Sequence, residues 1–227
     1  MRKATTKTTG TDRIEIGVQK PRKTEARFIL VGLPGSELVI HKWDEKAMKM
    51  IKDKQAKKLT KREVRDPEAE YEGAMYRLPN GAPAIRTYSF KASMASAAST
   101  LIEGVTKTKI NKAIHTVGEL TEIHGEPYMR EDMVRLGGMS NPADIRYRPA
   151  WKEWWVELVL EYDENYITTE QVVYILDTAG YNCGVGEMRD GKSGHGFGRF
   201  RIADAKEAEA LRTSGRKVRR AKRRRAA

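Results

Sequence analysis

The chain has 227 residues, a formal net charge of +12, a hydrophobic fraction of 39% and one cysteine. We expect one soluble domain with tails, because no apolar run approaches the roughly 18 residues that a membrane span needs. No apolar signal region follows the polar N-terminus, so we expect a cytoplasmic protein in a bacterial or phage-infected cell. The lone Cys183 excludes an internal disulfide and a thiolate metal cluster within one chain. We predict no metal and no cofactor.

The positive charge is concentrated at the C-terminal end. From Arg212 onward there are nine Lys or Arg and no acid, so the rest of the chain carries 34 basic and 31 acidic residues. Such a run attracts phosphate backbones without reading sequence, although a solubilising charge run has the same composition. We therefore expect a flexible basic arm (1–25), a folded domain (26–205) and a basic helix or tail (206–227).

The first predicted elements are a hairpin and a helix. The segments RFILV (27–31) and ELVIH (37–41) predict two strands, and the GLPGS sequence between them is typical of a turn. Asp44 can cap a helix over residues 45–59. Lysines cover so much of this helix that we expect it to be largely exposed, either as a solvated face or as a second surface for nucleic acid.

A second hairpin and a buried helix follow. The segment 74–90 predicts two extended pieces around the turn Pro79–Asn80–Gly81. Residues 90–104 combine small side chains with apolar positions at helical spacing, which predicts a helix packed closely against a sheet. Between residues 114 and 148 the pattern indicates strands and long loops.

The last third predicts a strand, a helix and a strand. Residues 154–162 alternate as a strand does, and a capped helix over 168–179 should end at Gly180. We expect a short strand into a glycine-rich loop and a returning strand at 198–202. The whole order suggests an α+β fold, with a ferredoxin-like or RRM-like β-α-β-β-α-β core, hairpin insertions and disordered basic termini.

The most specific segment is the loop GVGEMRDGKSGHGFGRF, which begins at Gly184. Glycine adopts positive φ easily and has no side chain, so such a loop can turn its N–H groups to an anion and let a sugar-phosphate chain approach. Arg189, Lys192 and Arg199 add positive charge. We predict contact with nucleic acid for these cations and for six glycines: Gly184, Gly186, Gly191, Gly194, Gly196 and Gly198. The alternative is a flexible hairpin tip.

The same loop contains the literal phosphate-loop pattern of nucleotide hydrolases, from Gly186 to Ser193. That motif requires a helix directly after the Ser, with its N-terminus facing the phosphates. The residues after Ser193 are glycines that lead into a strand pattern, FGRFRI. We therefore do not expect ATP or GTP hydrolysis.

A second basic region interleaves aromatic and basic side chains, a mixture that single-strand grooves use for stacking and phosphate contact. Its members are Tyr128, Arg130, Arg135, Arg146, Tyr147 and Arg148. We assign Arg146 and Arg148 to the predicted site. An Arg-Tyr-Arg sequence is equally common on an exposed strand, so this alternative stays open.

Two segments resemble the RAMP superfamily, the RRM-like proteins that form the RNA-binding backbone of CRISPR effector complexes. The glycine loop is similar to the family's C-terminal glycine-rich loop. The segment GAPAIRTYSFKASMASAAST is similar to the family's extended segment that leads through Ser-x-Lys into a small-residue helix. The resemblance implies an RRM-like fold, and it implies that Ser89 and Lys91 lie near the bound strand.

Over more of its length the chain resembles a protein family encoded by tailed bacteriophages and prophages. The shared segments, in the same order, are VIHKWDEKAMKMIKDKQ, YMREDMVRLGG, ADIRYRP and GVGEMRDGKSG. This resemblance implies a bacterial or viral setting and no particular activity.

We therefore predict a non-catalytic protein that grips single-stranded RNA or DNA. Self-association along the strand stays an open alternative. One alternative is a RAMP-like endoribonuclease, in which His41 or His195 would act as a general acid or base. Another is a phage structural or interaction protein that contacts DNA through its basic tail.

Overall fold

The computed structural model describes residues 20–42, 52–53, 55–56, 65–135, 143–190 and 194–226. Residues 1–19 of the predicted arm lie outside this part of the chain. So do most of the helix expected over 45–59 and the centre of the glycine loop, residues 191–193.

The larger sheet is antiparallel and has the strand order β10-β1-β9-β6-β4-β3, with β5 also paired to β9. Its strands are β1 (Lys23–Gly32), β3 (Tyr76–Arg77), β4 (Pro83–Arg86), β5 (Ile114–Thr116), β6 (Leu120–His124), β9 (Trp155–Asp163) and β10 (Phe200–Ile202). The predicted hairpin around Pro79–Asn80–Gly81 is confirmed as β3 and β4. The first strand begins three residues before the expected domain boundary at residue 26.

Two helices complete the predicted core. Helix α3 (Tyr88–Leu101) comes between β1 and the strands β5 and β6, which both pair with β9, and α5 (Thr169–Asn182) connects β9 to β10. The core therefore runs β1, α3, β5–β6, β9, α5, β10, with β1 and β9 at the centre of the sheet. This is the β-α-β-β-α-β order of a ferredoxin-like α+β fold, as the sequence predicted.

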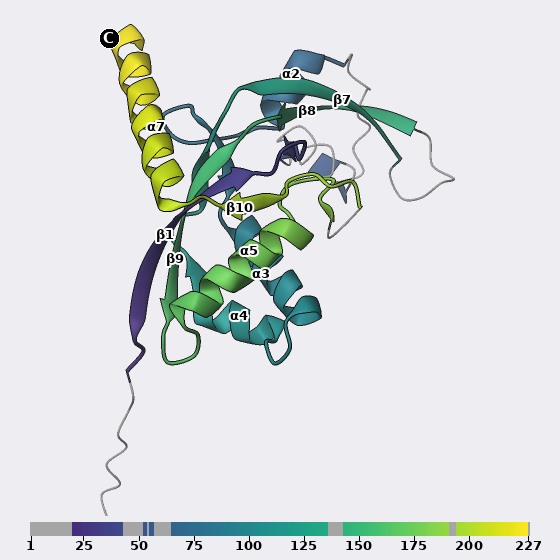
Figure 1. Ribbon diagram of the computed structural model, residues 1–227. Coiled ribbons are helices and arrows are strands. Elements are labelled where there is room, and N and C mark those ends of the chain that lie inside the picture. The colour runs from purple at the N-terminus through teal and green to yellow at the C-terminus, as the bar shows by residue number, and fades with distance from the viewer. Residues whose placement is uncertain are drawn as a thin grey trace, which may run out of the picture.

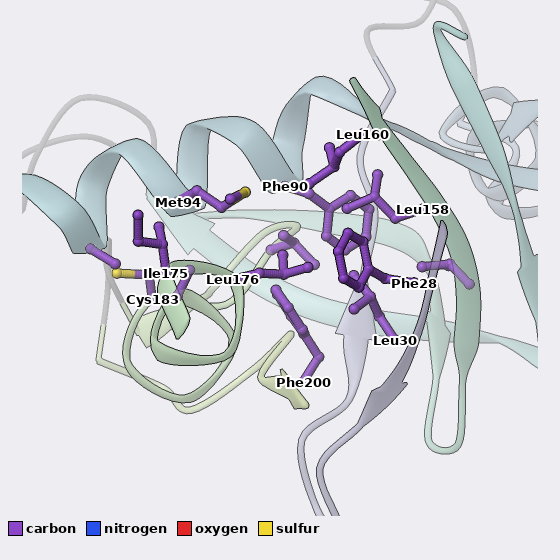
Figure 2. Close-up of a cluster of buried hydrophobic side chains, with 14 of the residues drawn as sticks. Phe28, Leu30, Phe90, Met94, Leu158, Leu160, Ile175, Leu176, Cys183 and Phe200 are labelled. Atoms are coloured by element: carbon purple, nitrogen blue, oxygen red, sulfur yellow. The ribbon is translucent and has the colours of Figure 1, made fainter. Parts of the chain in front are cut away.

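One face of the sheet packs against α3, α5 and the short α4 (Lys107–Ala113) (Figure 1). Along β9 every second side chain is buried, as the alternation of apolar residues in its sequence requires. Figure 2 shows side chains of this core from both helices and three strands: Phe28, Leu30, Phe90, Met94, Leu158, Leu160, Ile175, Leu176, Cys183 and Phe200.

Gly180 lies inside α5 and does not end it, contrary to the prediction. A Cβ atom on this residue would lie 2.3 Å from the carbonyl oxygen of Phe200 in β10. The glycine therefore permits close packing of α5 on β10, and the helix continues to Asn182. No strand follows directly after it in the described residues, because the chain turns at Cys183 into the glycine loop.

Helix α7 (Ala205–Ala226) lies on the opposite face of the sheet. Gly215 is buried, and a Cβ atom there would lie 3.2 Å from the ring of Trp155, which alternates along β9 with core residues. That ring stacks on His124 with 3.7 Å between centroids, and Arg212 Nε lies 3.2 Å from Glu157 Oε1. The C-terminal segment, predicted as a disordered terminus or a basic helix, is thus helical, and its end stands away from the sheet (Figure 1).

The smaller sheet has the order β2-β8-β7, formed by β2 (Leu38–Val39), β8 (Ala143–Trp151) and β7 (Pro127–Arg135). Helix α2 (Pro67–Gly73) packs against β8. The predicted hairpin of residues 27–31 with 37–41 is wrong, because β9 and β10 occupy both edges of β1 and β2 pairs with β8. No helix in the described part of the chain is long and apolar enough to cross a membrane.

Candidate nucleic-acid interface

The glycine loop, residues 184–199, is fastened at its base by backbone hydrogen bonds. Val185 N–H donates to the carbonyl of Gly198 at 2.9 Å, and Gly198 N–H donates to the carbonyl of Glu37 at 2.8 Å. The turn before β2 thus forms one wall of the loop. The two ends of the loop are held together, so its described residues form a defined surface.

Ser36 is the side chain that joins this wall to the loop, and only 3% of it is exposed. Its hydroxyl donates to the carbonyl of Gly196 at 2.6 Å and accepts the N–H of Arg199 at 2.7 Å. Its own carbonyl accepts the indole N–H of Trp154 at 3.1 Å. The loop is therefore connected through one buried serine to the hydrophobic core.

The predicted glycines fall into two groups, although all five that are described have positive φ. At Gly184, Gly186 and Gly198 a Cβ atom would lie 2.8, 2.5 and 1.7 Å from a backbone oxygen, so these residues serve internal packing. At Gly194 a Cβ atom would meet nothing within 4 Å, and at Gly196 its nearest neighbour would be Asp190 Oδ1 at 4.0 Å. In this second group the space beside the α carbon is open to a ligand, while the N–H of Gly196 donates to Asp190 and its carbonyl accepts from Ser36.

The described cations of the loop have partners within the protein. Arg189 Nη1 donates to the carbonyl of Gly186 at 2.9 Å, and Arg199 Nε donates to the carbonyl of Tyr181 at 2.7 Å. Asp190 lies 3.6 Å from Arg199 and accepts the N–H of Gly196 through its other oxygen. A guanidinium has five N–H donors, so Arg199 can reach a phosphate with donors other than Nε.

Tyr181 is a residue that the sequence analysis missed. It lies in the last turn of α5, directly before the loop, and 61% of it is exposed. The guanidinium carbon of Arg199 lies 4.3 Å from the centroid of its ring. The available signal was its place off the apolar stripe of α5: an aromatic residue that does not face the core, beside a glycine-rich loop, indicates a contact surface.

The structure places both predicted residues, Arg146 and Arg148, in β8, and only Arg148 is too buried to contact nucleic acid. Arg148 is 6% exposed, and its Nη2 donates to Asp132 at 3.0 Å, so it is a buried ion pair rather than a phosphate ligand. Asp132 also accepts from Arg130 Nε at 2.9 Å. Arg146 is partly exposed and pairs with Asp144 at 3.1 Å. Arg146 and Arg148 therefore form ion pairs within the β7–β8 hairpin, which these pairs stabilise.

Arg130 connects this hairpin to the glycine loop. Its Nη1 donates to Glu37 Oε2 at 2.8 Å, and its guanidinium carbon lies 4.8 Å from the ring centroid of Phe197. The hydroxyl of Tyr128 donates to the same Glu37 oxygen at 2.5 Å. The loop thus lies between β10, the turn before β2 and the hairpin.

Ser89 and Lys91 lie in the first turn of α3, which begins two residues before the predicted helix, and Lys91 packs toward α4. Its ammonium donates to the carbonyl of Asn111 at 2.9 Å, and burial lowers its pKa. The α3 residue that meets the start of the loop is Ser96, which hydrogen bonds to Cys183. Burial raises the pKa of that thiol, which agrees with a packed cysteine. Gly191 and Lys192 lie outside the described residues.

The loop and the turn of α7 that precedes its basic half meet the sheet at the same end. The loop runs into Phe200, which pairs with Gly32 at the end of β1. Gly215 packs against Trp155, which pairs with Val31 one residue earlier in β1. After Gly215 the helix has eight Lys or Arg in its last eleven residues. Two cationic segments that are separate in the sequence are thus anchored at the same end of the sheet.

Among the described residues, the side chains that could act in catalysis are not gathered into one site. His195 is exposed in the loop, and its ring is 6.4 Å from that of Phe197. Across the described ranges, no three His, Cys, Asp or Glu side chains form a group that could hold a metal ion. The residues after Ser193 lead into β10 and not into a helix, so the phosphate-loop reading fails on the structural context it requires.

These features define a mixed α+β protein with a ferredoxin-like core and a fastened glycine loop at one end of its sheet. No family model matches the chain, and no curated protein matches it. A similar solved structure is the crystal structure of Cmr6 from Pyrococcus furiosus. The two share 12% sequence identity with a TM-score of 0.43, over 80% of this chain and 99% of that chain. The likeness is distant and concerns the course of the chain alone.

Proposed function

We propose that this protein binds single-stranded RNA or DNA, without catalysis, by holding the strand's backbone on the glycine loop. The observation that carries the proposal is the open pair Gly194 and Gly196. Both have positive φ, and a Cβ atom would meet nothing within 4 Å at Gly194 and only Asp190 Oδ1, at 4.0 Å, at Gly196. Hydrogen bonds hold the two ends of the loop together. A preorganised backbone without side chains lets a sugar-phosphate chain approach closely.

The basic half of α7 supplies attraction that does not depend on sequence. A helix with eight Lys or Arg in eleven residues, at the same end of the sheet as the loop, raises the local concentration of a polyanion. Because Arg212 and Gly215 anchor the preceding turn on β9, the basic half of α7 begins at a fixed point of the folded domain.

RRM-type proteins stack bases on aromatic side chains of the open sheet face. Here α7 contacts that face at Gly215, beside the stack of Trp155 on His124. These two rings are only partly exposed and already stack on each other. The exposed loop is the surface that requires no rearrangement.

The alternative functions predict different experimental results. An endoribonuclease would use the exposed His195 as a general acid or base, so its activity would be lost in His195→Ala. A phage structural protein that uses only its basic tail would bind duplex and single strand alike through α7. Self-association along a strand, which the resemblance to effector backbones suggests, would appear as cooperative binding to longer oligonucleotides.

The test is fluorescence anisotropy with a labelled, unstructured 20-nucleotide strand and a duplex of equal length. We expect tighter binding of the single strand. Gly196→Val should weaken it at least tenfold, because a β-branched side chain resists positive φ and blocks the approach. Gly104→Val is the matched control, since Gly104 has the same φ of 74° with nothing within 4 Å, between α3 and α4. Equal binding by both variants would exclude the loop as the site.

The same samples test catalysis. Labelled RNA incubated with the wild-type protein should remain intact on a denaturing gel, and His195→Ala should bind as the wild type does. Cleavage that disappears in His195→Ala would replace the binding proposal with the nuclease. Circular dichroism of each variant checks that it is folded.

A further inference from the structure

Tyr181 combines a large exposed ring with a cation on one side. The guanidinium of Arg199 covers one face of the ring at 4.3 Å, while 61% of the residue is exposed. Exposure of that extent requires the opposite face of the ring to be open to solvent. An aromatic ring with one face supported by a guanidinium and the other face open is a surface on which a planar group can stack.

The ring is held in place by the loop itself. Arg199 Nε donates to the carbonyl of Tyr181 at 2.7 Å and lies 3.6 Å from Asp190 Oδ2. Asp190 also accepts the N–H of Gly196. Three contacts, from Gly196 to Asp190, from Asp190 to Arg199 and from Arg199 to Tyr181, therefore connect the loop to the exposed ring.

A packing role accounts poorly for this residue. Core positions of α5 are less than 2% exposed, and Tyr181 lies on the outer face of the helix, where a polar side chain would avoid exposing apolar area. The matching residue is Tyr174, two turns earlier on the same helix, with 60% exposed. No cation lies over its ring among the described residues. Tyr174 is therefore as exposed as Tyr181, but no described cation lies over its ring and it is not next to the glycine loop.

We propose that the open face of Tyr181 stacks a nucleobase of the strand whose backbone lies on the glycine loop. This inference rests on the proposed function and deepens it, since the site then contacts base as well as phosphate. Every base has a π face, so such a contact tightens binding without selecting a sequence. Arg199 supports the ring from behind and keeps further N–H donors for a phosphate.

The experiment compares Tyr181→Ala with Tyr174→Ala on a base-containing oligonucleotide and on an abasic oligonucleotide of the same length. Stacking predicts that Tyr181→Ala weakens binding of the base-containing strand by about 5- to 150-fold. It should leave binding of the abasic strand unchanged. Tyr174→Ala should behave as the wild type on both, and Tyr181→Phe should retain binding, because the ring and not the hydroxyl makes the contact.

A direct readout uses 2-aminopurine, whose fluorescence falls when it stacks. The signal should be quenched by the wild-type protein and by Tyr181→Phe, at one position of the strand, and not by Tyr181→Ala. Wild-type protein that binds neither oligonucleotide would overturn the proposed function together with this site. Strand binding that is unaffected by Tyr181→Ala, or equally affected by Tyr174→Ala, would overturn the stacking site alone.

Discussion

Gly198→Ala should destabilise the protein far more than an alanine elsewhere in the same loop. A Cβ atom at Gly198 would lie 1.7 Å from the carbonyl oxygen of Val185, a backbone atom that cannot rotate away. The two segments must separate, which breaks the hydrogen bonds from Val185 to Gly198 and from Gly198 to Glu37. The positive φ of 67° adds a further cost for any residue with a Cβ atom.

The magnitude follows from these contributions. Left-handed backbone costs alanine about 1 to 2 kcal/mol, and each lost hydrogen bond costs about 0.5 to 1.5 kcal/mol. Together they predict a loss of about 2 to 5 kcal/mol in the free energy of unfolding. Gly194→Ala is the control, because Gly194 has nearly the same φ, 68°, with nothing within 4 Å. It should lose only the backbone contribution.

Urea denaturation followed by circular dichroism measures both losses, with the slope of the transition as a check that the unfolding remains two-state. The expected difference between the two variants isolates the collision with Val185. Equal midpoints for Gly198→Ala and Gly194→Ala would refute the division of the glycines into packing residues and open residues.

Two further predictions concern charge. Truncation after Gly215 removes eight Lys or Arg but keeps Arg212 and its contact with Glu157. Strand affinity should therefore fall and the dependence of log affinity on log salt should flatten, while the melting temperature stays nearly unchanged. An unaltered salt slope would show that the basic half of α7 contacts no phosphate. Asp132→Asn should cost about 3 to 5 kcal/mol of stability because it leaves the buried Arg148 uncompensated. Asp144→Asn, at a partly exposed pair, should cost at most about 1 kcal/mol, and similar losses for the two variants in urea would contradict the burial of Arg148.

The elements of the fold were predictable where the pattern is local. The alternation of apolar residues predicted β9. Apolar positions at helical spacing, together with a cap, predicted α5, and the Asn80–Gly81 turn predicted the β3–β4 hairpin. Pairing between distant strands was not predictable from short segments. The apolar run 27–31 has no feature that says its partners are β9 and β10 rather than its neighbour 37–41.

The candidate site was predictable as a segment and not residue by residue. Glycine-rich sequence marks a special backbone, but whether a glycine accommodates the protein or a ligand depends on what lies beside it. At Gly186 that neighbour is the carbonyl of Val39 in another sheet, 2.5 Å from the position of a Cβ atom. The same limit applies to Arg148, whose burial depends on its cross-strand neighbours. Long-range packing decides both cases.

Helix α7 gives a physical reason for base contacts to lie at the end of α5. The face that stacks bases in RRM-type proteins carries Trp155 and His124 here, and these rings already stack on each other below Gly215. Within the described ranges, the ring of Tyr181 has no such aromatic partner on its open face, and it is exposed beside the loop. A strand that binds without moving α7 therefore finds an exposed aromatic ring at Tyr181.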